Sequence, residues 1–269
     1  MFFQELLLFA MTQLIGIFVV LKSQTLIQNQ IAFDLTAGEI VFFLIFLTLF
    51  IYFTRKFSRK SAFFFRLILG LAVFAGSQTV FSLLFNEVIV STLIAVLLTF
   101  GVLKAKIVLL HNIGIVLALA GIGAVLGISL KPLSVIILLL ILSFYDIIAV
   151  YKTGHMVKMA EDMIKSRAIF GLVIPKKFQG WKENLRNVRV PGSEFMILGS
   201  GDIVMPLLLI ASVIGFHGLA SGLVVFLFSM LGLFLTYYLF ITQKTRRPMA
   251  ALPPIAAMSI VGYLVALFF

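Results

Sequence analysis

Long apolar stretches separated by short polar connections follow one another along the whole chain. A helix needs roughly 17 to 25 mostly apolar residues to cross a bilayer, and nine stretches reach that length. They predict helices over 3–21, 38–54, 62–85, 87–103, 107–129, 132–151, 194–214, 218–240 and 251–269. The pattern therefore predicts an all-α, polytopic membrane protein with about nine transmembrane helices.

The spacing of these stretches divides one transmembrane domain, 1–269, into three parts. Residues 1–151 hold the first six predicted helices, 152–193 form the only long loop, and 194–269 hold the last three. The apolar run Ala168–Ile174 within the loop is too short to span, so we expect it to lie at the interface or pack back onto the bundle. The loop is either a lid or substrate-docking element, or a basic linker on an anionic membrane surface.

Composition supports a membrane environment and removes several alternatives. The chain is 62% hydrophobic and only 12% charged, which is too apolar for a water-soluble surface. The net charge of +11 lies in clusters between the apolar spans, a pattern that orients membrane proteins and argues against nucleic-acid binding. Cysteine is absent, which excludes disulfides, thiol catalysis and cysteine-based metal sites.

The distribution of basic residues predicts an orientation. Most of the 21 lysines and arginines fall in the loops after the second, fourth, sixth and eighth predicted helices. Such loops are cytoplasmic under the positive-inside rule. We therefore expect a multi-pass protein of the cell membrane, with the N-terminus and the loop 152–193 in the cytoplasm and the C-terminus outside. The first stretch, Leu6–Leu21, has no basic lead-in or cleavage site, so it is interpreted as a retained helix.

Two aspartates fall at membrane depth, Asp146 in the sixth predicted helix and Asp202 in the seventh. An ionisable group there costs on the order of 2.5 to 3.5 kcal/mol, so it usually faces a cavity or another polar group. Counted along helices at about 1.5 Å per residue, both lie roughly 9 to 12 Å below the cytoplasmic boundary. Two facing carboxyls cannot easily both ionise, and aspartic proteases use such a pair that shares one proton. The alternative is a protonated aspartate hydrogen-bonded between helices.

Four further carboxylates, Glu5, Asp34, Glu39 and Glu87, lie near predicted helix ends, where water is close.

Small residues and prolines lie near the two aspartates in the predicted fold. Gly199 and Gly201 flank Ser200 directly before Asp202, which leaves room for a substrate backbone, although small residues also allow helices to pack closely. Pro253 and its neighbour Pro254 remove amide donors from the start of the ninth helix, although proline is also common at helix starts.

These three places resemble the motifs of the presenilin and signal peptide peptidase family of intramembrane aspartyl proteases. Tyr145-Asp146 matches the Tyr-Asp of the family's sixth helix, and Gly199-Ser200-Gly201-Asp202 matches its Gly-x-Gly-Asp. Ala251-Leu252-Pro253 fits the third motif, Pro-Ala-Leu, except that Ala250 stands in place of the first proline. The order of motifs, the loop and the helix count extend the resemblance over the full chain, and its size is closest to the archaeal members.

The resemblance implies a presenilin-like bundle and an endopeptidase. Asp146 and Asp202 would be catalytic, and Leu252 would help to shape the site, with Tyr145, Gly199, Ser200, Gly201, Ala251 and Pro253 around it. The substrate would be a transmembrane helix that unwinds before cleavage, with water and lipid as the other partners. Whether partner subunits or a homo-oligomer are needed stays open.

The same sequence features allow one alternative function and argue against several others. A proton- or ion-coupled transporter could use the same acid pair as a relay. Prepilin peptidases, a related Gly-x-Gly-Asp class, typically carry lysine where Val204 stands. His111, His155 and His217 lie in different segments without a zinc-binding spacing, and His111 is interpreted as a satisfied polar group. The absence of Gly-x-Ser-x-Gly argues against serine proteolysis, and the absence of phosphate-binding loops argues against nucleotide use. Water and two carboxyl groups suffice for hydrolysis, so we expect no cofactor and no metal.

Overall fold

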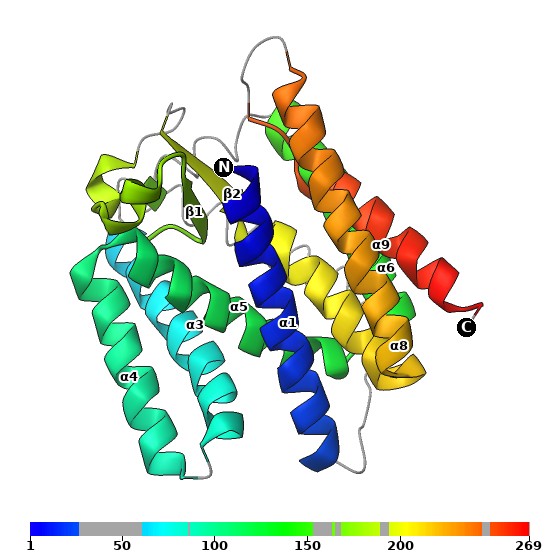
Figure 1. The fold of residues 1–269 in the computed structure, drawn as a ribbon, viewed down its shortest axis with the longest axis horizontal. Coiled ribbons are helices and arrows are strands. Elements are labelled where there is room, and N and C mark those ends of the chain that lie inside the picture. The colour runs from blue at the N-terminus through cyan, green and yellow to red at the C-terminus, as the bar shows by residue number, and fades with distance from the viewer. Residues whose placement is uncertain are drawn as a thin grey trace.

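The computed structural model is mostly helical (Figure 1). It describes residues 1–26, 61–85, 87–152, 163–164, 168–188, 194–243 and 248–268. The helices are α1 (Phe2–Leu26), α3 (Ser61–Leu84), α4 (Val88–Ala105), α5 (Val108–Ile128), α6 (Pro132–Ile147), α8 (Ser200–Ile241) and α9 (Leu252–Ala266). The predicted helix over 38–54 lies outside the described residues.

The described helices have the length and composition of membrane spans. Six of them are long and apolar enough to cross a bilayer, namely α1, α3, α4, α5, α6 with its extension to Lys152, and α8. The shorter α9 is also apolar. Since these counts cover only the described ranges, the total of nine helices stays a prediction. Apolar side chains such as Ile89 (75% exposed) and Leu97 (62%) on α4 point outward, as is typical of lipid contact.

A single glycine separates the predicted seventh helix from the predicted eighth. Gly218 has φ 86° and ψ 174°, a conformation open only to glycine, and it interrupts the helical geometry inside α8. The two halves of α8 run side by side in opposite directions, yellow then orange in Figure 1. The predicted break between 214 and 218 is therefore confirmed as a sharp reversal at Gly218.

The expectation of an all-α fold is wrong at one place. Strand β1 (Gly171–Pro175) pairs antiparallel with β2 (Phe195–Gly199) in a two-stranded sheet. The strand β2 occupies the first residues of the helix predicted over 194–214, which instead begins at Ser200. A five-residue apolar run has too little periodicity to distinguish strand from helix, and Val173 and Ile174 favour the strand because they are β-branched.

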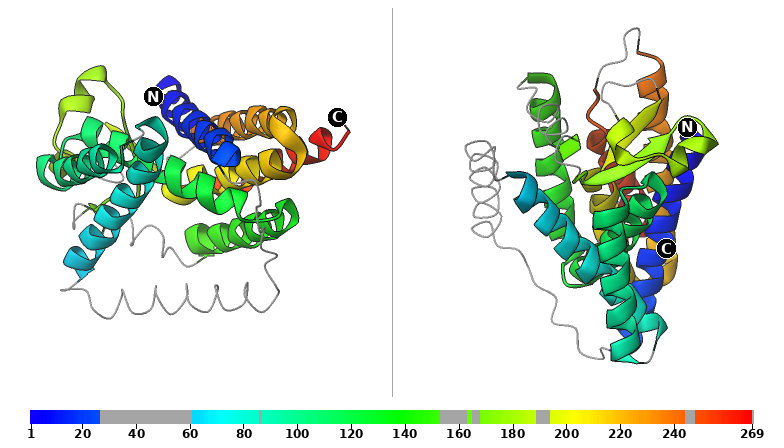
Figure 2. Two further views of the ribbon diagram at one scale, coloured as in Figure 1. Left: turned by 90° about the horizontal axis from the view of Figure 1, so that it is seen from below. Right: turned by 90° about the vertical axis from the view of Figure 1, so that its left-hand side faces the viewer.

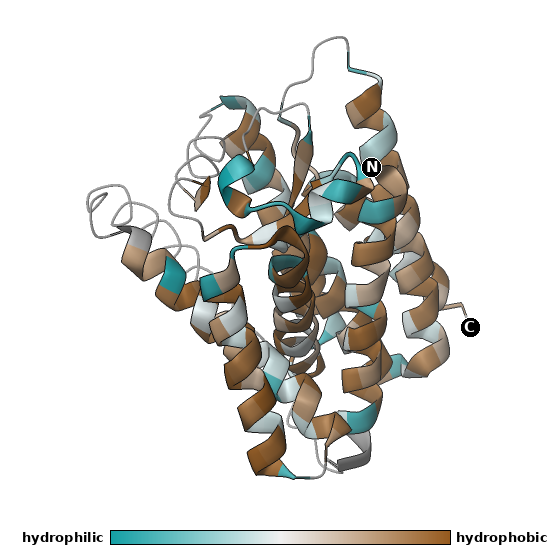
Figure 3. Ribbon diagram, turned by 60° about the vertical axis from the view of Figure 1, so that its left-hand side comes forward, coloured by the Kyte–Doolittle hydropathy of each residue, from teal (hydrophilic) through white to brown (hydrophobic). Residues whose placement is uncertain are grey.

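The apolar run Ala168–Ile174 packs back onto the bundle, as one of the two expectations held. All five residues of β1 are buried, and the strand contacts α5. Two 3-10 turns, η2 (Phe178–Lys182) and η3 (Leu185–Asn187), follow it. In Figure 3 the hydrophilic residues gather around this sheet, while the helix bodies are mostly hydrophobic.

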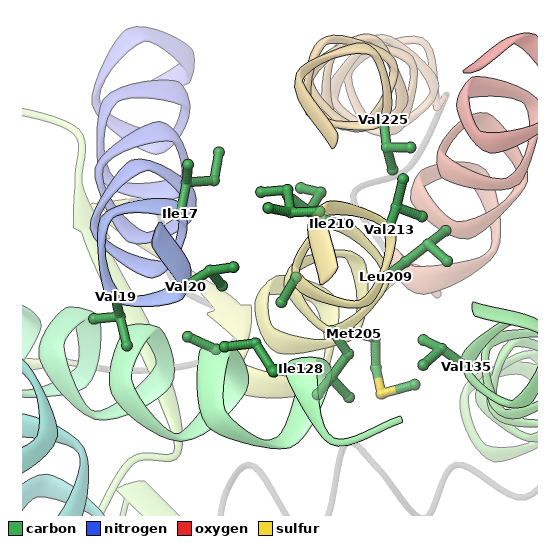
Figure 4. Close-up of a cluster of buried hydrophobic side chains, with 14 of the residues drawn as sticks. Ile17, Val19, Val20, Ile128, Val135, Met205, Leu209, Ile210, Val213 and Val225 are labelled. Atoms are coloured by element: carbon green, nitrogen blue, oxygen red, sulfur yellow. The ribbon is translucent and has the colours of Figure 1, made fainter. Parts of the chain in front are cut away.

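Helix α5 lies at the centre and packs against α1, α3 and α8 (Figure 2). Small residues allow this close approach: a Cβ on Gly123 would come within 2.8 Å of Leu207 on α8, and Gly76 of α3 meets the backbone of Ala118. Figure 4 shows the core between α1, α5 and α8, which includes Ile17, Ile128 and Ile210. This packing fixes the start of α8, where Asp202 lies.

Candidate active site

Asp146 occupies the last turn of α6 and is only 6% exposed. The backbone N–H of Leu252, at the start of α9, donates a hydrogen bond to its carboxyl group. Its Oδ2 atom is buried and has no hydrogen-bond partner among the described residues. Directly after it, Ile148–Lys152 form one turn of π-helix, η1, a feature that is frequent at functional sites.

Asp202 lies in the first turn of α8 and is 7% exposed. The N–H of Gly199, the last residue of β2, donates a hydrogen bond to its carboxyl group. The depth estimate for Asp202 assumed a helix that begins at Glu194, and this assumption is wrong because the five residues before Ser200 are extended. The end of β2 sets its position.

The structure brings the two aspartates together from different helices. Asp146 and Asp202 lie close enough to interact electrostatically, and α6, α8 and α9 pack against one another. Each carboxyl group receives one backbone N–H, from Leu252 and from Gly199. The arrangement is a buried pair of acids, each oriented by the main chain.

The start of α9 supplies a single amide to this pair. Leu252, Pro253 and Pro254 open the helix, and because proline has no N–H, Leu252 is the only amide donor among these three. The second half of α8 holds this end in place: a Cβ on Gly232 would lie 2.7 Å from Cα of Ile255, so the two helices are in backbone contact. Ala251 is the N-cap of α9, which places the whole motif beside Asp146.

The glycines before Asp202 differ in their surroundings. A Cβ on Gly199 would lie 3.0 Å from Oδ2 of Asp202, so any side chain there would push against the carboxyl group. A Cβ on Gly201 would meet no atom within 4 Å, and this residue is exposed. Between them, Ser200 is half-buried and begins α8, and Tyr145 is half-buried next to Asp146. Gly201 thus leaves open space at the start of α8, one residue before Asp202.

Two polar residues near the pair were not among the candidates from the sequence. Ser143 precedes Asp146 by three residues, a spacing that puts both on one face of α6, and its buried Oγ has no hydrogen-bond partner in the described structure. Glu5, expected near water at a helix end, is 3% exposed and interacts electrostatically with Asp202 from α1. The i, i+3 spacing could have revealed Ser143, but nothing local indicates that Glu5 is buried.

Within the described ranges, no three His, Cys, Asp or Glu side chains are grouped so that they could hold a metal ion. A polytopic, helical membrane protein with two buried, electrostatically interacting aspartates beside a proline-containing helix start is the class that fold and site define.

Comparisons with known proteins agree with this class. The family model "Signal-peptide peptidase, presenilin aspartyl protease" matches residues 6–269. Two solved structures of a presenilin family intramembrane aspartate protease are similar over nearly the whole chain. The form in space group C222 has a TM-score of 0.63 and 25% identity, and covers 97% of this chain and 94% of that one. The P2 form has a TM-score of 0.66 and 26% identity, and covers 98% and 96%. The search among curated proteins gives no match.

The chain belongs to the signal-peptide peptidase and presenilin family of aspartyl proteases. It is an intramembrane aspartic endopeptidase, and its substrates are transmembrane proteins. The alternative of a proton- or ion-coupled transporter is not favoured.

Proposed function

We propose that Asp146 and Asp202 are the catalytic pair of this protease. One carboxylate takes a proton from a water molecule, whose oxygen attacks the substrate carbonyl carbon. The other carboxyl group, protonated, donates its proton to the carbonyl oxygen. When the tetrahedral intermediate collapses, the C–N bond breaks, the amine leaves with a proton and the pair returns to its singly protonated state. This cycle needs no group beyond the pair and water.

The observation that carries this proposal is the geometry of the two aspartates: they interact with each other, and the main chain orients both. Asp146 and Asp202 come from separate helices, interact electrostatically and are each bonded by one backbone N–H. Their remaining oxygens can then face water and substrate. Oδ2 of Asp146 and Oγ of Ser143 are buried polar atoms without a partner in the described residues, and both can bond to a reacting peptide.

The outer edge of β2 is the proposed docking site for the unwound substrate. A helix hides its amides, so cleavage requires a locally extended segment, and an extended segment binds most simply by adding a strand to a free edge. The sheet has only two strands in the described part of the chain, with β1 on one side of β2. Its other side is therefore available for backbone pairing.

The alternation of hydrogen bonds along β2 identifies the backbone groups on that edge. The N–H of Ser200 bonds to O of Phe170, and the N–H of Lys176 bonds to O of Glu194, so the even-numbered residues of β2 face β1. The odd-numbered residues face away, as the bond from Gly199 to Asp202 also requires. Ile197 therefore presents both its N–H and its C=O on the outer edge. It lies two residues before Gly199, whose N–H bonds to Asp202.

The open space beside Gly201 continues this path toward the acids. Gly201 is exposed and a Cβ there would contact nothing, whereas Gly199 is in contact with Asp202. A strand paired along β2 would thus pass Gly201 as it reaches the pair. We assign Gly199 to holding Asp202, and Ser200 and Gly201 to substrate passage, with Tyr145, Ala251, Leu252 and Pro253 forming the opposite wall.

For the orientation, we propose that the end of the molecule that carries the sheet faces the cytoplasm, with the N-terminus there and the C-terminus outside. The basic turn between α4 and α5 is tied to the segment after β1: the N–H of Leu185 bonds to O of Lys106 and that of Val108 to O of Glu183. Lys104, Lys106, Lys182 and Arg186 are thereby brought to one end, as the positive-inside rule favours.

The chain has no cysteine, so a single cysteine in place of Lys182 can be labelled from one side only. Labelling from the extracytoplasmic side would contradict this orientation.

The function is tested with purified protein in liposomes and a membrane-spanning substrate. We expect cleavage that a transition-state analogue for aspartic proteases blocks, and we expect a photoreactive form of that analogue to label the wild type but not Asp202→Ala. The matched control is Glu87→Gln, which removes an exposed carboxyl group and should be labelled as strongly as the wild type. Proton flux that persists with the inhibitor bound, without any cleavage, would instead favour a transporter.

A further inference from the structure

The inner edge of β1 is paired with a side chain that imitates a strand. Nδ2 of Asn112, on α5, donates to O of Val173 at 2.7 Å, and the N–H of Val173 donates to Oδ1 of Asn112 at 2.9 Å. A side-chain amide offers one donor and one acceptor in the same arrangement as a peptide group, so Asn112 occupies the place of a neighbouring strand. Asn112 is completely buried.

His111, the preceding residue, bonds to the same edge. Its Nε2 lies 3.1 Å from O of Gly171, and since a carbonyl only accepts, Nε2 carries the hydrogen. The residue is 1% exposed. The prediction of a satisfied polar group is thus confirmed for Nε2, while Nδ1 is buried and has no partner among the described residues. Together His111 and Asn112 bond to alternate residues of β1, the ones that face away from β2.

These contacts join α5 to the catalytic pair through a continuous set of backbone bonds. Asn112 fixes the position of Val173, β1 fixes the register of β2, and Gly199 at the end of β2 bonds to Asp202. A two-stranded sheet is only marginally stable alone, so it depends on partners outside the sheet. The buried bonds to α5 therefore hold the sheet at one fixed position along the bundle.

We propose that Asn112, assisted by His111, is a positioning residue that determines which peptide bond of the substrate reaches the acid pair. The inference rests on the proposed pairing of substrate with the outer edge of β2. If the substrate is in register with β2, and β2 is in register with α5, then a movement of the sheet changes the residue that lies between the aspartates. Asn112 thus controls the position of the cut without touching substrate or water.

The test is the distribution of cleavage sites, measured by mass spectrometry of the products from one membrane-spanning substrate. Asn112→Leu keeps the branched shape and the number of side-chain heavy atoms but loses both bonds to Val173. We expect the fraction of products cut at neighbouring bonds to rise severalfold, with a larger fall in kcat than rise in KM. Asn112→Asp keeps the acceptor for the N–H of Val173, so it should restore most of the wild-type distribution.

The matched control is Gln78→Leu, which removes a half-buried amide that bonds to Ser91 and Thr92 between α3 and α4, away from the sheet. It should leave the cleavage positions unchanged even where it lowers thermal stability as much as Asn112→Leu does. An unchanged distribution in Asn112→Leu and Asn112→Asp, with activity falling only as stability falls, would overturn the proposal. Failure of the wild type to cut at all would instead contradict the proposed function, so the two outcomes are distinct.

Discussion

Replacing Asp202 by asparagine should lower kcat/KM for a membrane-spanning substrate by at least about 100- to 10,000-fold, the range typical of a lost general acid or base. Asparagine has the same shape but cannot take or give the proton. Asp146→Asn should cost as much. The measurement is cleavage rate with purified protein in liposomes, together with thermal unfolding to show that the fold is retained.

The double variant supplies a second, sharper criterion. Because the two acids act as one unit, Asp146→Asn combined with Asp202→Asn should be no slower than either single variant. Glu87→Gln, the same chemical change at an exposed position before α4, should cut at the wild-type rate. A wild-type rate in either single variant would show that the acid pair does not perform the chemistry.

Much of the helical architecture is predictable because it depends on composition. Lengths of apolar sequence set the spans, and the division into 194–214 and 218–240 agrees with the break in helical geometry at Gly218. The two aspartates were found because charged groups at membrane depth are costly and few. Two helices that are consecutive and antiparallel often lie side by side, and the structure places the two aspartates close enough to interact electrostatically.

The parts that sequence reasoning missed depend on distant partners. Residues 195–199 form a strand only because 171–175 lie beside them, and the short run itself has no period that excludes a helix. The N–H of Leu252 bonds to Asp146 across more than a hundred residues of chain, which the motif alone does not reveal. The burial of Glu5 likewise follows from packing of α1 against α8, since its own neighbours in sequence favour a wet helix end.

Replacing Ile197 by proline should produce the second large effect, because it removes one N–H from the outer edge of β2. Only the even-numbered residues of β2 bond to β1, so the N–H of Ile197 points away from β1 and no bond between the strands is lost. Proline is tolerated at such edge positions and is destructive on the paired side. We expect the protein to unfold at nearly the wild-type temperature, while kcat/KM for a transmembrane substrate falls by about 10-fold or more, the effect of one lost backbone hydrogen bond of about 1.5 kcal/mol.

Two neighbouring variants separate the backbone from the side chain. Ile197→Ala keeps the N–H and loses the side chain, so it should retain most of the activity that Ile197→Pro loses. Leu198→Pro removes an N–H that faces β1 and should destabilise the sheet itself, with a lowered unfolding temperature. A small inhibitor that binds only the aspartates should still bind Ile197→Pro, because the acid pair is held by Gly199 and Leu252. Equal activity in Ile197→Pro and Ile197→Ala would mean that substrate does not pair with this edge, and that it reaches Asp146 and Asp202 by another path.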